Sequence, residues 1–360
     1  SSTKVLSLTD GGTVDLSGFS STSGASSLNG LTDVLVETNS IYIGNDPSST
    51  TSTAEKNVAV GVSALDAITT GDNNIAVGYD ALRENTTGGS NMASGTSALA
   101  LNTTGNYNTA LGTQALYGNT TGDFNTASGS NALASNTTGE KNTALGLQAL
   151  YLNTTGSNNM ASGFEALKAN TTGSNNIAMG SDALAANTTA NYNTAIGDSA
   201  MVDNTIGYSN TASGYQSLAS NTTGYRNTAM GSQALYSNTQ GNLNTALGFA
   251  ALGDNTTGGR NTATGYKALL YNTTGSQNTA SGFYSLLSNT TGDYNTASGY
   301  MALRNNTTGT NNNAFGHAAL YSNTTGYSNS AVGNGSLAEN TTGNNNSAFG
   351  VNSLSLNTTG

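Results

Sequence analysis

Small and apolar residues recur at a fixed period of 17 from Asn57 to the end of the 360-residue chain. The segment 102–118 serves as the reference unit, and a column is the set of positions that lie multiples of 17 from one of its residues. The Ala110 column holds 18 copies of alanine, from Ala59 to Ala348. A fixed period in this range is typical of a solenoid, in which each repeat forms one rung that stacks on the next.

Three further columns keep the same phase. The Asn108 column is always asparagine, the Gly112 column is always glycine, and the Leu116 column is leucine except at Met201. Charged residues make up only 8% of the chain, and low charge combined with low hydrophobicity usually indicates disorder. A disordered chain has no reason to keep strict phase, so the columns predict a folded array.

Within a rung, two short segments have the character of strands. These are 107–111 and, beyond a bend at Gly112, 113–117; the Asn-Thr-Thr-Gly sequence then closes the rung, because these residues favour turns. A helix is disfavoured, since frequent glycine with asparagine and threonine costs several tenths to about 1 kcal/mol per residue. Ala110 and Leu111 point to opposite faces of a strand, and the pattern does not determine which face is interior. It predicts an all-β fold, a parallel β-solenoid or β-roll of 17-residue rungs.

The first 50 residues lie outside the repeat. They predict a small β cap or connector at 1–50, followed by a solenoid of about 18 rungs at 51–360. Terminal caps are expected where a solenoid would otherwise leave an open end. The cap strands are expected at 5–8 and 14–17, joined as a hairpin by Asp10-Gly11-Gly12, and at 34–36 and 41–44.

The interior of one such rung is thin. Burial of one leucine contributes roughly 1.5–3 kcal/mol, whereas ordering the backbone costs about 1–2 kcal/mol per residue. Stacked asparagine columns add hydrogen bonds along the axis, as in cross-β ladders. The remaining burial is most easily supplied by other copies of the chain, so the sequence predicts an obligate homo-oligomer.

Composition narrows the partners. The net charge of -10 disfavours attraction to nucleic acid or to an anionic membrane. No apolar run approaches the roughly 20 residues of a membrane span, so no membrane insertion is expected. The chain has no cysteine, which excludes a disulfide framework and a thiolate metal site.

Segments such as Asn74-Ile75-Ala76-Val77-Gly78-Tyr79-Asp80-Ala81 resemble the head repeats of trimeric autotransporter adhesins, which form a trimer of left-handed parallel β-rolls. The longer unit Asn-Thr-Ala-x-Gly-x-x-Ala-Leu-x-x-Asn-Thr-Thr-Gly is similar to repeats of bacteriophage tail fibres. The resemblance covers about 57–360 and implies a left-handed, homotrimeric solenoid. The period departs from the adhesin head, which has about 14 residues, so the Asn-Thr-Thr-Gly segment must make a larger turn.

Catalysis and metal binding are not expected. The single histidine, His317, lies in the variable Thr113 column, and the acidic residues are scattered over unrelated columns: Asp123, Glu140, Glu165, Asp198 and Asp254. Glycosidases need two carboxylates held on opposite sides of a bond, and nothing selects such a pair. The Gly-Gly-x-Gly-x-Asp pattern of calcium-binding β-rolls is absent from the sequence. We therefore expect no enzyme activity, cofactor or metal.

The Thr113 column is the candidate ligand-contacting site. It contains aromatic residues on four consecutive rungs, with a tyrosine before them and the histidine after them: Tyr215, Phe249, Tyr266, Phe283, Tyr300 and His317. Exposed aromatic rings in a row could contact sugar rings of a cell-surface polysaccharide. The alternative is that the rings pack on one another and on a neighbouring subunit.

These patterns favour an extracellular structural shaft with multivalent attachment, in a phage tail fibre of a virion or in a bacterial surface adhesin. Its partners would be further copies of itself, most simply a trimer, and a host polysaccharide or other receptor. One alternative is an extracellular filament without a ligand on this segment. Another is an ice-binding solenoid, because the Thr109 column holds threonine on seven successive rungs from Thr194 to Thr296.

Overall fold

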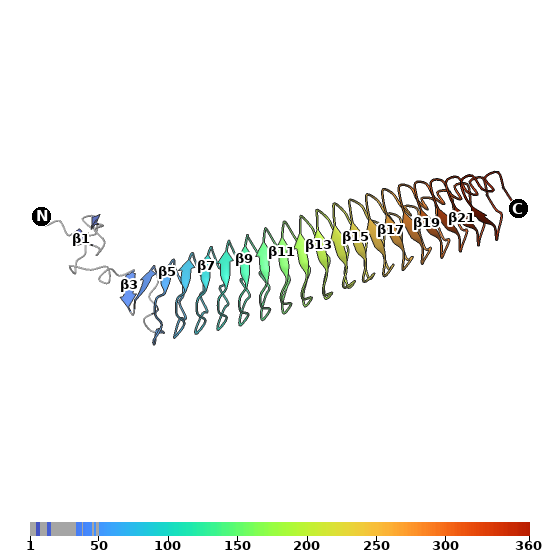
Figure 1. Ribbon diagram of the computed structural model, residues 1–360. Coiled ribbons are helices and arrows are strands. Elements are labelled where there is room, and N and C mark those ends of the chain that lie inside the picture. The colour runs from blue at the N-terminus through green and yellow to red at the C-terminus, as the bar shows by residue number, and fades with distance from the viewer. Residues whose placement is uncertain (1–4, 8–12, 16–33, 38, 45–46, 48–49) are drawn as a thin grey trace. The chain divides into compact units, whose positions relative to one another are not determined.

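The computed structural model describes residues 5–7, 13–15, 34–37, 39–44, 47 and 50–360. They fall into two compact units, 1–155 and 156–360, and each unit is a β-solenoid whose strands lie side by side in successive rungs (Figure 1). Among the described residues there is no helix of a length and hydrophobicity that could cross a membrane.

The first unit begins with two antiparallel pairs. Strand β1 (Val5–Ser7) pairs with β2 (Thr13–Asp15), which confirms the predicted hairpin. Strand β3 (Val34–Glu37) pairs with β4 (Ser40–Ile43), close to the predicted positions. Strand β4 also pairs in parallel with the first strand of the repeat. The Asp10-Gly11-Gly12 turn lies outside the described residues.

Every rung of the repeat contributes one strand of three residues. In the first unit the parallel strands are β5 (Val58–Val60), β6 (Ile75–Val77), β7 (Met92–Ser94), β8 (Thr109–Leu111), β9 (Thr126–Ser128) and β10 (Thr143–Leu145). In the second unit they are β11 (Met160–Ser162), β12 (Ile177–Met179), β13 (Thr194–Ile196), β14 (Thr211–Ser213), β15 (Thr228–Met230), β16 (Thr245–Leu247), β17 (Thr262–Thr264), β18 (Thr279–Ser281), β19 (Thr296–Ser298), β20 (Asn313–Phe315), β21 (Ser330–Val332) and β22 (Ser347–Phe349). Each strand pairs in register with its neighbour, as in Ala110↔Ala127.

The prediction of a second strand at 113–117 is wrong. That segment is a series of turns, because Gln114 and Leu116 have φ values of 55° and 52°, in the left-handed region. A strand alternates its side chains between two faces, whereas here the adjacent residues Ala115 and Leu116 are both fully buried. The left-handed conformation at Leu116 turns its side chain inward beside that of Ala115. Two adjacent side chains of this segment therefore face the interior, which an extended strand would not allow.

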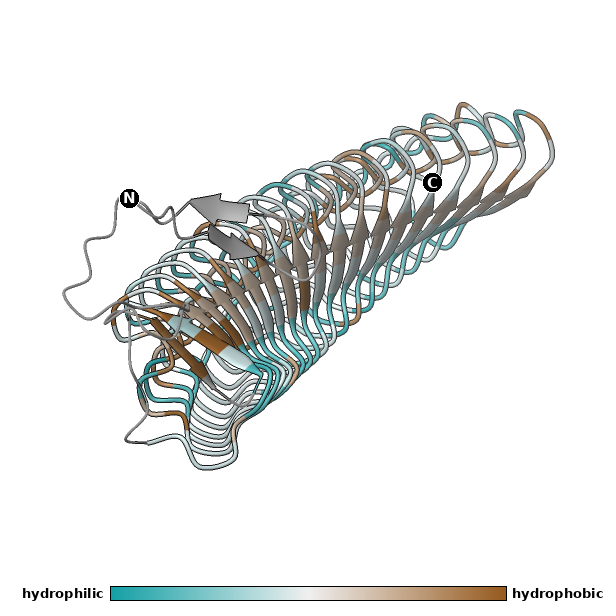
Figure 2. Cartoon of the chain, turned by 90° about the vertical axis from the view of Figure 1, so that its left-hand side faces the viewer, coloured by the Kyte–Doolittle hydropathy of each residue, from teal (hydrophilic) through white to brown (hydrophobic). Residues whose placement is uncertain are grey.

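The interior is filled by small residues, leucine and asparagine. Ala110, Ala115 and Leu116 are 0% exposed, and the equivalent positions of the inner rungs are buried as well. Figure 2 shows how hydrophobic residues recur at the same place in successive rungs. The orientation that the sequence left open is thus settled: Ala110 faces inward, and Thr109 and Leu111 face outward. At the start of the sheet, Tyr42 takes the place of the alanine and is also fully buried.

Two asparagine ladders connect the rungs within each unit, as the sequence predicts, and the structure shows that they are buried. In the first ladder, Asn108 N–H donates to Asn91 Oδ1 (2.9 Å) and Asn108 Nδ2 donates to the carbonyl of Gly122 (2.9 Å). In the second, Asn119 Nδ2 donates to Asn102 Oδ1 (2.7 Å) and to the same carbonyl (3.0 Å). A buried amide must be hydrogen-bonded to avoid a cost of about 1–3 kcal/mol. Asparagine meets this requirement on every inner rung because the next rung supplies an identical partner.

Candidate functional site

The outward side chains of the parallel strands form one continuous surface in each unit. We call this surface, made of the Thr109 and Leu111 columns, the outer strand face. It mixes threonine and serine with apolar residues whose exposure is near two fifths, such as Ile177 (37%), Met179 (42%) and Met230 (49%). Because the strands pair in register, equivalent side chains of neighbouring rungs lie next to one another.

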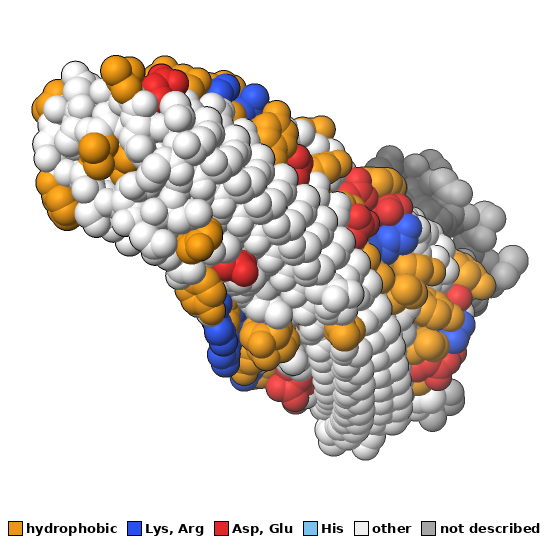
Figure 3. Space-filling model, turned by 90° about the vertical axis from the view of Figure 1, so that its right-hand side faces the viewer, with side chains coloured by type: hydrophobic (Ala, Val, Ile, Leu, Met, Phe, Trp, Pro, Cys, Tyr) orange, Lys and Arg blue, Asp and Glu red, His pale blue; other side chains and the backbone are white. Residues whose placement is uncertain are grey.

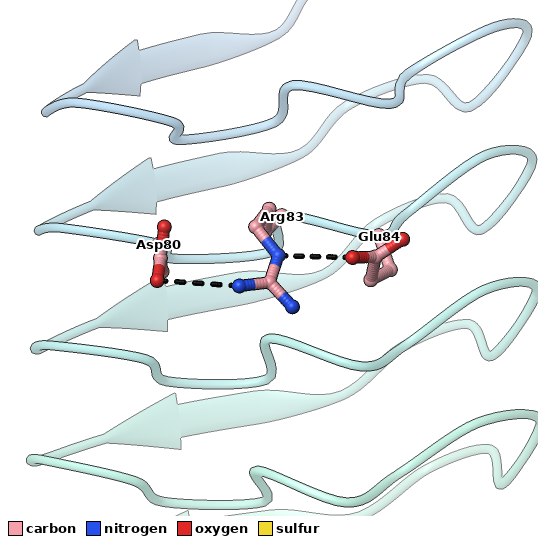
Figure 4. Close-up of polar contacts among 3 residues, drawn as sticks. All are labelled: Asp80, Arg83 and Glu84. Carbon is pink, nitrogen blue, oxygen red and sulfur yellow. Dashed lines mark hydrogen bonds and ion pairs between the residues drawn. The ribbon is translucent and has the colours of Figure 1, made fainter.

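Charge is sparse around the rungs. On the face shown in Figure 3, most of the surface is uncharged polar side chain and backbone. The best-formed ion-pair cluster is in the first unit, where Arg83 contacts Asp80 Oδ2 at 3.3 Å and Glu84 Oε1 at 2.9 Å (Figure 4). The hydrogen bond to Glu84 raises the pKa of Arg83 above its ordinary value. Arg83 and Glu84 are both partly exposed, and exposed pairs contribute about 0–1 kcal/mol, so this pair adds little to the stability of the fold.

The candidate aromatic column contains a stack of five rings in the second unit. The ring centroids of Phe249 and Tyr266 lie 5.4 Å apart, those of Tyr266 and Phe283 5.1 Å, and those of Phe283 and Tyr300 5.4 Å. His317 continues the series at 5.2 Å from Tyr300. All four interplanar angles are 14° or less. We call these five residues the aromatic stack.

Tyr215 belongs to the same column but not to the stack. Ser232 occupies the intervening rung, so the tyrosine has no ring beside it and remains 52% exposed. The structure therefore brings together five of the six residues that the sequence singled out. Their role in ligand contact stays a prediction.

The geometry of the stack limits how a ligand could use it. Tyr266, Phe283 and Tyr300 each have a ring on both sides, so their faces are covered by their neighbours and only their edges reach solvent. A sugar binds an aromatic residue best through the ring face, where its C–H groups meet the π electrons. The stack therefore offers a ribbon of ring edges along its length and free faces only at its two ends.

Neighbouring columns reinforce the aromatic stack. Tyr284 packs against Phe283 with centroids 4.2 Å apart, and the Lys267 ammonium lies 5.4 Å from the Tyr266 ring centroid. Arg304 lies 5.9 Å from the ring of Tyr284 and 5.7 Å from that of Tyr321. Such cation–π contacts contribute about 0.5–1 kcal/mol at exposed sites. These contacts indicate that the aromatic stack stabilises the surface of the second unit.

Two shorter stacks lie in other columns. Tyr107 and Phe124 are stacked at 5.0 Å in the first unit, and Tyr208 and Tyr225 at 5.0 Å in the second. Ring stacking between successive rungs is therefore a general consequence of placing aromatic residues in adjacent copies of one column.

The acidic residues remain dispersed. Asp123 accepts a hydrogen bond from the backbone N–H of Asn106 (2.6 Å), and Glu165 pairs with Lys168 (2.8 Å). Partial burial raises the pKa of the Asp254 carboxyl. No group of three metal-binding side chains comes together within the part of the chain that the structure describes.

No model of a known protein family matches the chain, and no curated protein is similar to it in sequence. The fold therefore defines the class: a tandem-repeat β-solenoid with 17-residue rungs. Within this class, a regular array of closed rungs is suited to a structural role.

Proposed function

We propose that the chain is the shaft and attachment region of an extracellular fibre, either a phage tail fibre or a bacterial surface adhesin. The observation that carries this proposal is that each rung combines buried columns with columns that face solvent. The alanine, leucine and asparagine columns are buried and vary little, with Met201 for leucine and serine for alanine at Ser217, whereas the outward columns vary from rung to rung. Such a scaffold can display chemically different contacts at regular intervals.

Several copies of the chain would assemble through the outer strand face, with three as the expected number. This face is the largest regular set of half-exposed apolar side chains among the described residues, and contiguous apolar surface of this kind usually marks an interaction site. Parallel copies in register would present the same columns together. Avidity could then replace strong individual contacts.

Binding to intact cells tests the proposal. The purified protein, labelled with a fluorophore on its primary amines, is incubated with a panel of bacteria and with an array of their surface polysaccharides. A shaft with attachment sites is expected to bind at least one surface, and an oligomer is expected to bind more tightly than a dissociated chain. A filament without a ligand on this segment would bind none of them, and that result would count against attachment.

The outward threonines favour a second candidate, ice binding. Thr194 to Thr296 occupy seven successive rungs on the outer strand face, and each strand pairs in register with the next. A flat, regular array of hydroxyl and methyl groups could order water. Thermal hysteresis and ice recrystallisation inhibition measure this directly, and their absence would remove the candidate.

A further inference from the structure

The second unit has a notch in a column where many rungs are joined by backbone-to-side-chain hydrogen bonds. In the Asn106 column, the backbone N–H of one rung commonly donates to a side-chain oxygen of the next rung. Asn106 donates to Asp123 Oδ1 at 2.6 Å, and Ser276 donates to Asp293 Oδ1 at 2.7 Å. A carboxylate oxygen is therefore a partner that this position already accepts elsewhere in the chain.

At Asn242 the next rung carries Gly259, which has no side chain. A Cβ atom placed on Gly259 would lie 3.8 Å from the Asn242 nitrogen and 3.1 Å from its oxygen, so the notch opens directly onto this amide. The Asn242 carbonyl accepts a hydrogen bond from Arg260 N–H (2.9 Å), and its Oδ1 accepts one from Tyr225 N–H (2.8 Å). Within the described residues, no acceptor pairs with the Asn242 N–H.

The notch is the floor of a groove of about 270 Å³ whose walls carry complementary groups. Arg260 is exposed on one wall and forms no ion pair among the described residues. The groove is lined by Tyr225, Asn242, Leu243, Thr257, Gly259, Arg260, Ser276 and Gln277. Its volume lies just below the range of about 300–1,000 Å³ that is typical of ligand sites, so it suits no more than a single sugar residue.

Tyr225 supplies an aromatic face at one end of the groove. One side of its ring is covered by Tyr208, but the next residue of the column is Asn242, so no ring covers the other side. The Arg226 guanidinium lies 6.0 Å from the Tyr225 ring centroid and adds positive charge at this end. A pyranose ring can stack on such a free face, in contrast to the covered rings inside the aromatic stack.

We infer that this groove binds a sugar that carries a carboxylate. The sugar ring packs on Tyr225, and its carboxylate accepts hydrogen bonds from the Asn242 N–H and the Arg260 guanidinium. Two rungs further on, the Asp293 carboxylate accepts from the Ser276 N–H in the same way that the ligand would accept from the Asn242 N–H. Charge-assisted hydrogen bonds of this kind contribute more than neutral ones. Ser276 Oγ, which accepts from Gly259 N–H at 3.1 Å, and Gln277 offer further polar contacts to the hydroxyls. The inference deepens the proposed attachment function and rests on it for its biological meaning.

The rest of the chain offers a natural comparison. Gly89 makes an equivalent notch in the first unit, where an added Cβ would lie 3.2 Å from Asp72 O. The side chain beside that notch is itself a carboxylate, and the following residue is Ser90 instead of arginine. A carboxylate ligand would be repelled there, so the notch of Gly259 is distinguished by its charge.

Saturation-transfer NMR with glucuronate tests the site, with glucose as the neutral match and glucose 6-sulfate as the second anion. Wild type is expected to bind glucuronate and to prefer it to both other sugars. Gly259→Asn fills the notch with asparagine, which this column already contains at Asn106 and Asn242, so the fold is expected to be retained. The new side chain would accept the hydrogen bond from the Asn242 N–H. The affinity for glucuronate is expected to fall at least tenfold, since a hydrogen bond to a charged group contributes about 1.5–3 kcal/mol.

Arg260→Gln should lower the affinity by a similar factor, and the matched control Gly89→Asn should leave it unchanged. Circular dichroism establishes that all three variants are folded. Equal binding of glucuronate by wild type and Gly259→Asn, or no binding by wild type, would overturn the site, and equal binding of the sulfate would overturn its assignment to a carboxylate. Cell binding by a protein that ignores glucuronate would leave the attachment function standing without this site. Glucuronate binding without any cell binding would support the site and count against the attachment function.

Discussion

Three non-glycine residues in a typical rung have left-handed backbone conformations, as at Tyr107, Gln114 and Leu116. Such a conformation costs an L-residue roughly 1–2 kcal/mol. At Leu116 the cost is offset by complete burial of the side chain, which contributes roughly 1.5–3 kcal/mol. The comparison explains why this column tolerates an unfavourable φ and why it is restricted to leucine and one methionine.

Gly112 is more constrained than any of these residues. Its φ is 131°, and a Cβ atom would lie 2.7 Å from the carbonyl oxygen of Gly129 in the next rung. We expect Gly112→Ala to lower the free energy of unfolding by about 2–4 kcal/mol, because backbone strain and a backbone clash act together. Gly89→Ala is the control, since its φ is not left-handed and its nearest contact is 3.2 Å. Urea denaturation measures both, and equal stability of the two variants would contradict this account of the column.

Asp254 predicts a pH dependence with a definite sign. Partial burial raises the pKa of its carboxyl in the folded state, so folding favours the protonated form. The contribution to stability is therefore present at low pH and is lost as pH rises through the folded pKa. We expect Asp254→Asn to be more stable than wild type at pH 7 and to match it in acid. Thermal denaturation across this pH range measures the difference in stability between Asp254→Asn and wild type. A difference that does not change with pH would mean that the carboxyl is fully hydrated and would contradict this prediction.

At the scale of the element, the repeating coil could be predicted from the sequence, but the backbone conformation within each rung was predicted only in part. The 17-residue period, the stacking of the asparagines and the strand around Ala110 follow from repeated residue types, because identical residues in adjacent rungs must occupy identical environments. The segment after Gly112 was misread as a strand, since its composition allows one. The adjacent, nearly constant pair Ala115-Leu116 carried the contrary signal, because two neighbouring buried residues break the alternation of a strand.

The aromatic stack is an element of its own, and removal of a central ring should interrupt it. Phe283→Ala separates Tyr266 from Tyr300 and also deletes the contact with Tyr284, so we expect a loss of about 1.5–4.5 kcal/mol, at 0.5–1.5 kcal/mol for each of the three aromatic pairs. Near-ultraviolet circular dichroism should change as the tyrosines lose their partner. Tyr215→Ala, which removes a ring without an aromatic neighbour in its column, should change stability much less. Similar effects of the two variants would mean that stacking adds nothing to simple burial.

The candidate site shows the limit of inference from columns. The sequence located the aromatic stack because its residues recur at one spacing. It did not reveal that stacking would cover the ring faces, since ring orientation depends on side-chain torsions within the fold. The groove at Gly259 was missed for the opposite reason: it depends on a single absent side chain beside Tyr225 and Arg260. A glycine between Asn242 and Ser276, in a column where such residues often accept hydrogen bonds, was the available signal.

At the scale of the whole molecule, the outer strand face predicts assembly in solution. Met179→Lys combined with Ile196→Lys places two charges on this face and should dissociate the oligomer, because unpaired charges are costly to bury in an interface. Ile206→Lys is the control, since Ile206 is 54% exposed and belongs to the turn that closes the rung. Sedimentation equilibrium measures the mass of each protein. A wild type that is folded and monomeric at all concentrations would contradict the assembly.

The asparagine ladders have a consequence for how such a protein can change over generations. Each ladder residue bonds to a partner exactly one period away, as Asn119 does to Asn102 and Asn136 to Asn119. Loss or duplication of 17 residues therefore rejoins like with like, whereas a change of 16 or 18 would place threonine or leucine where alanine must sit. Recombination between repeats can therefore change the length of the solenoid by whole rungs without changing the residues of its interior. The reach of the protein and the composition of its surface can thus evolve separately.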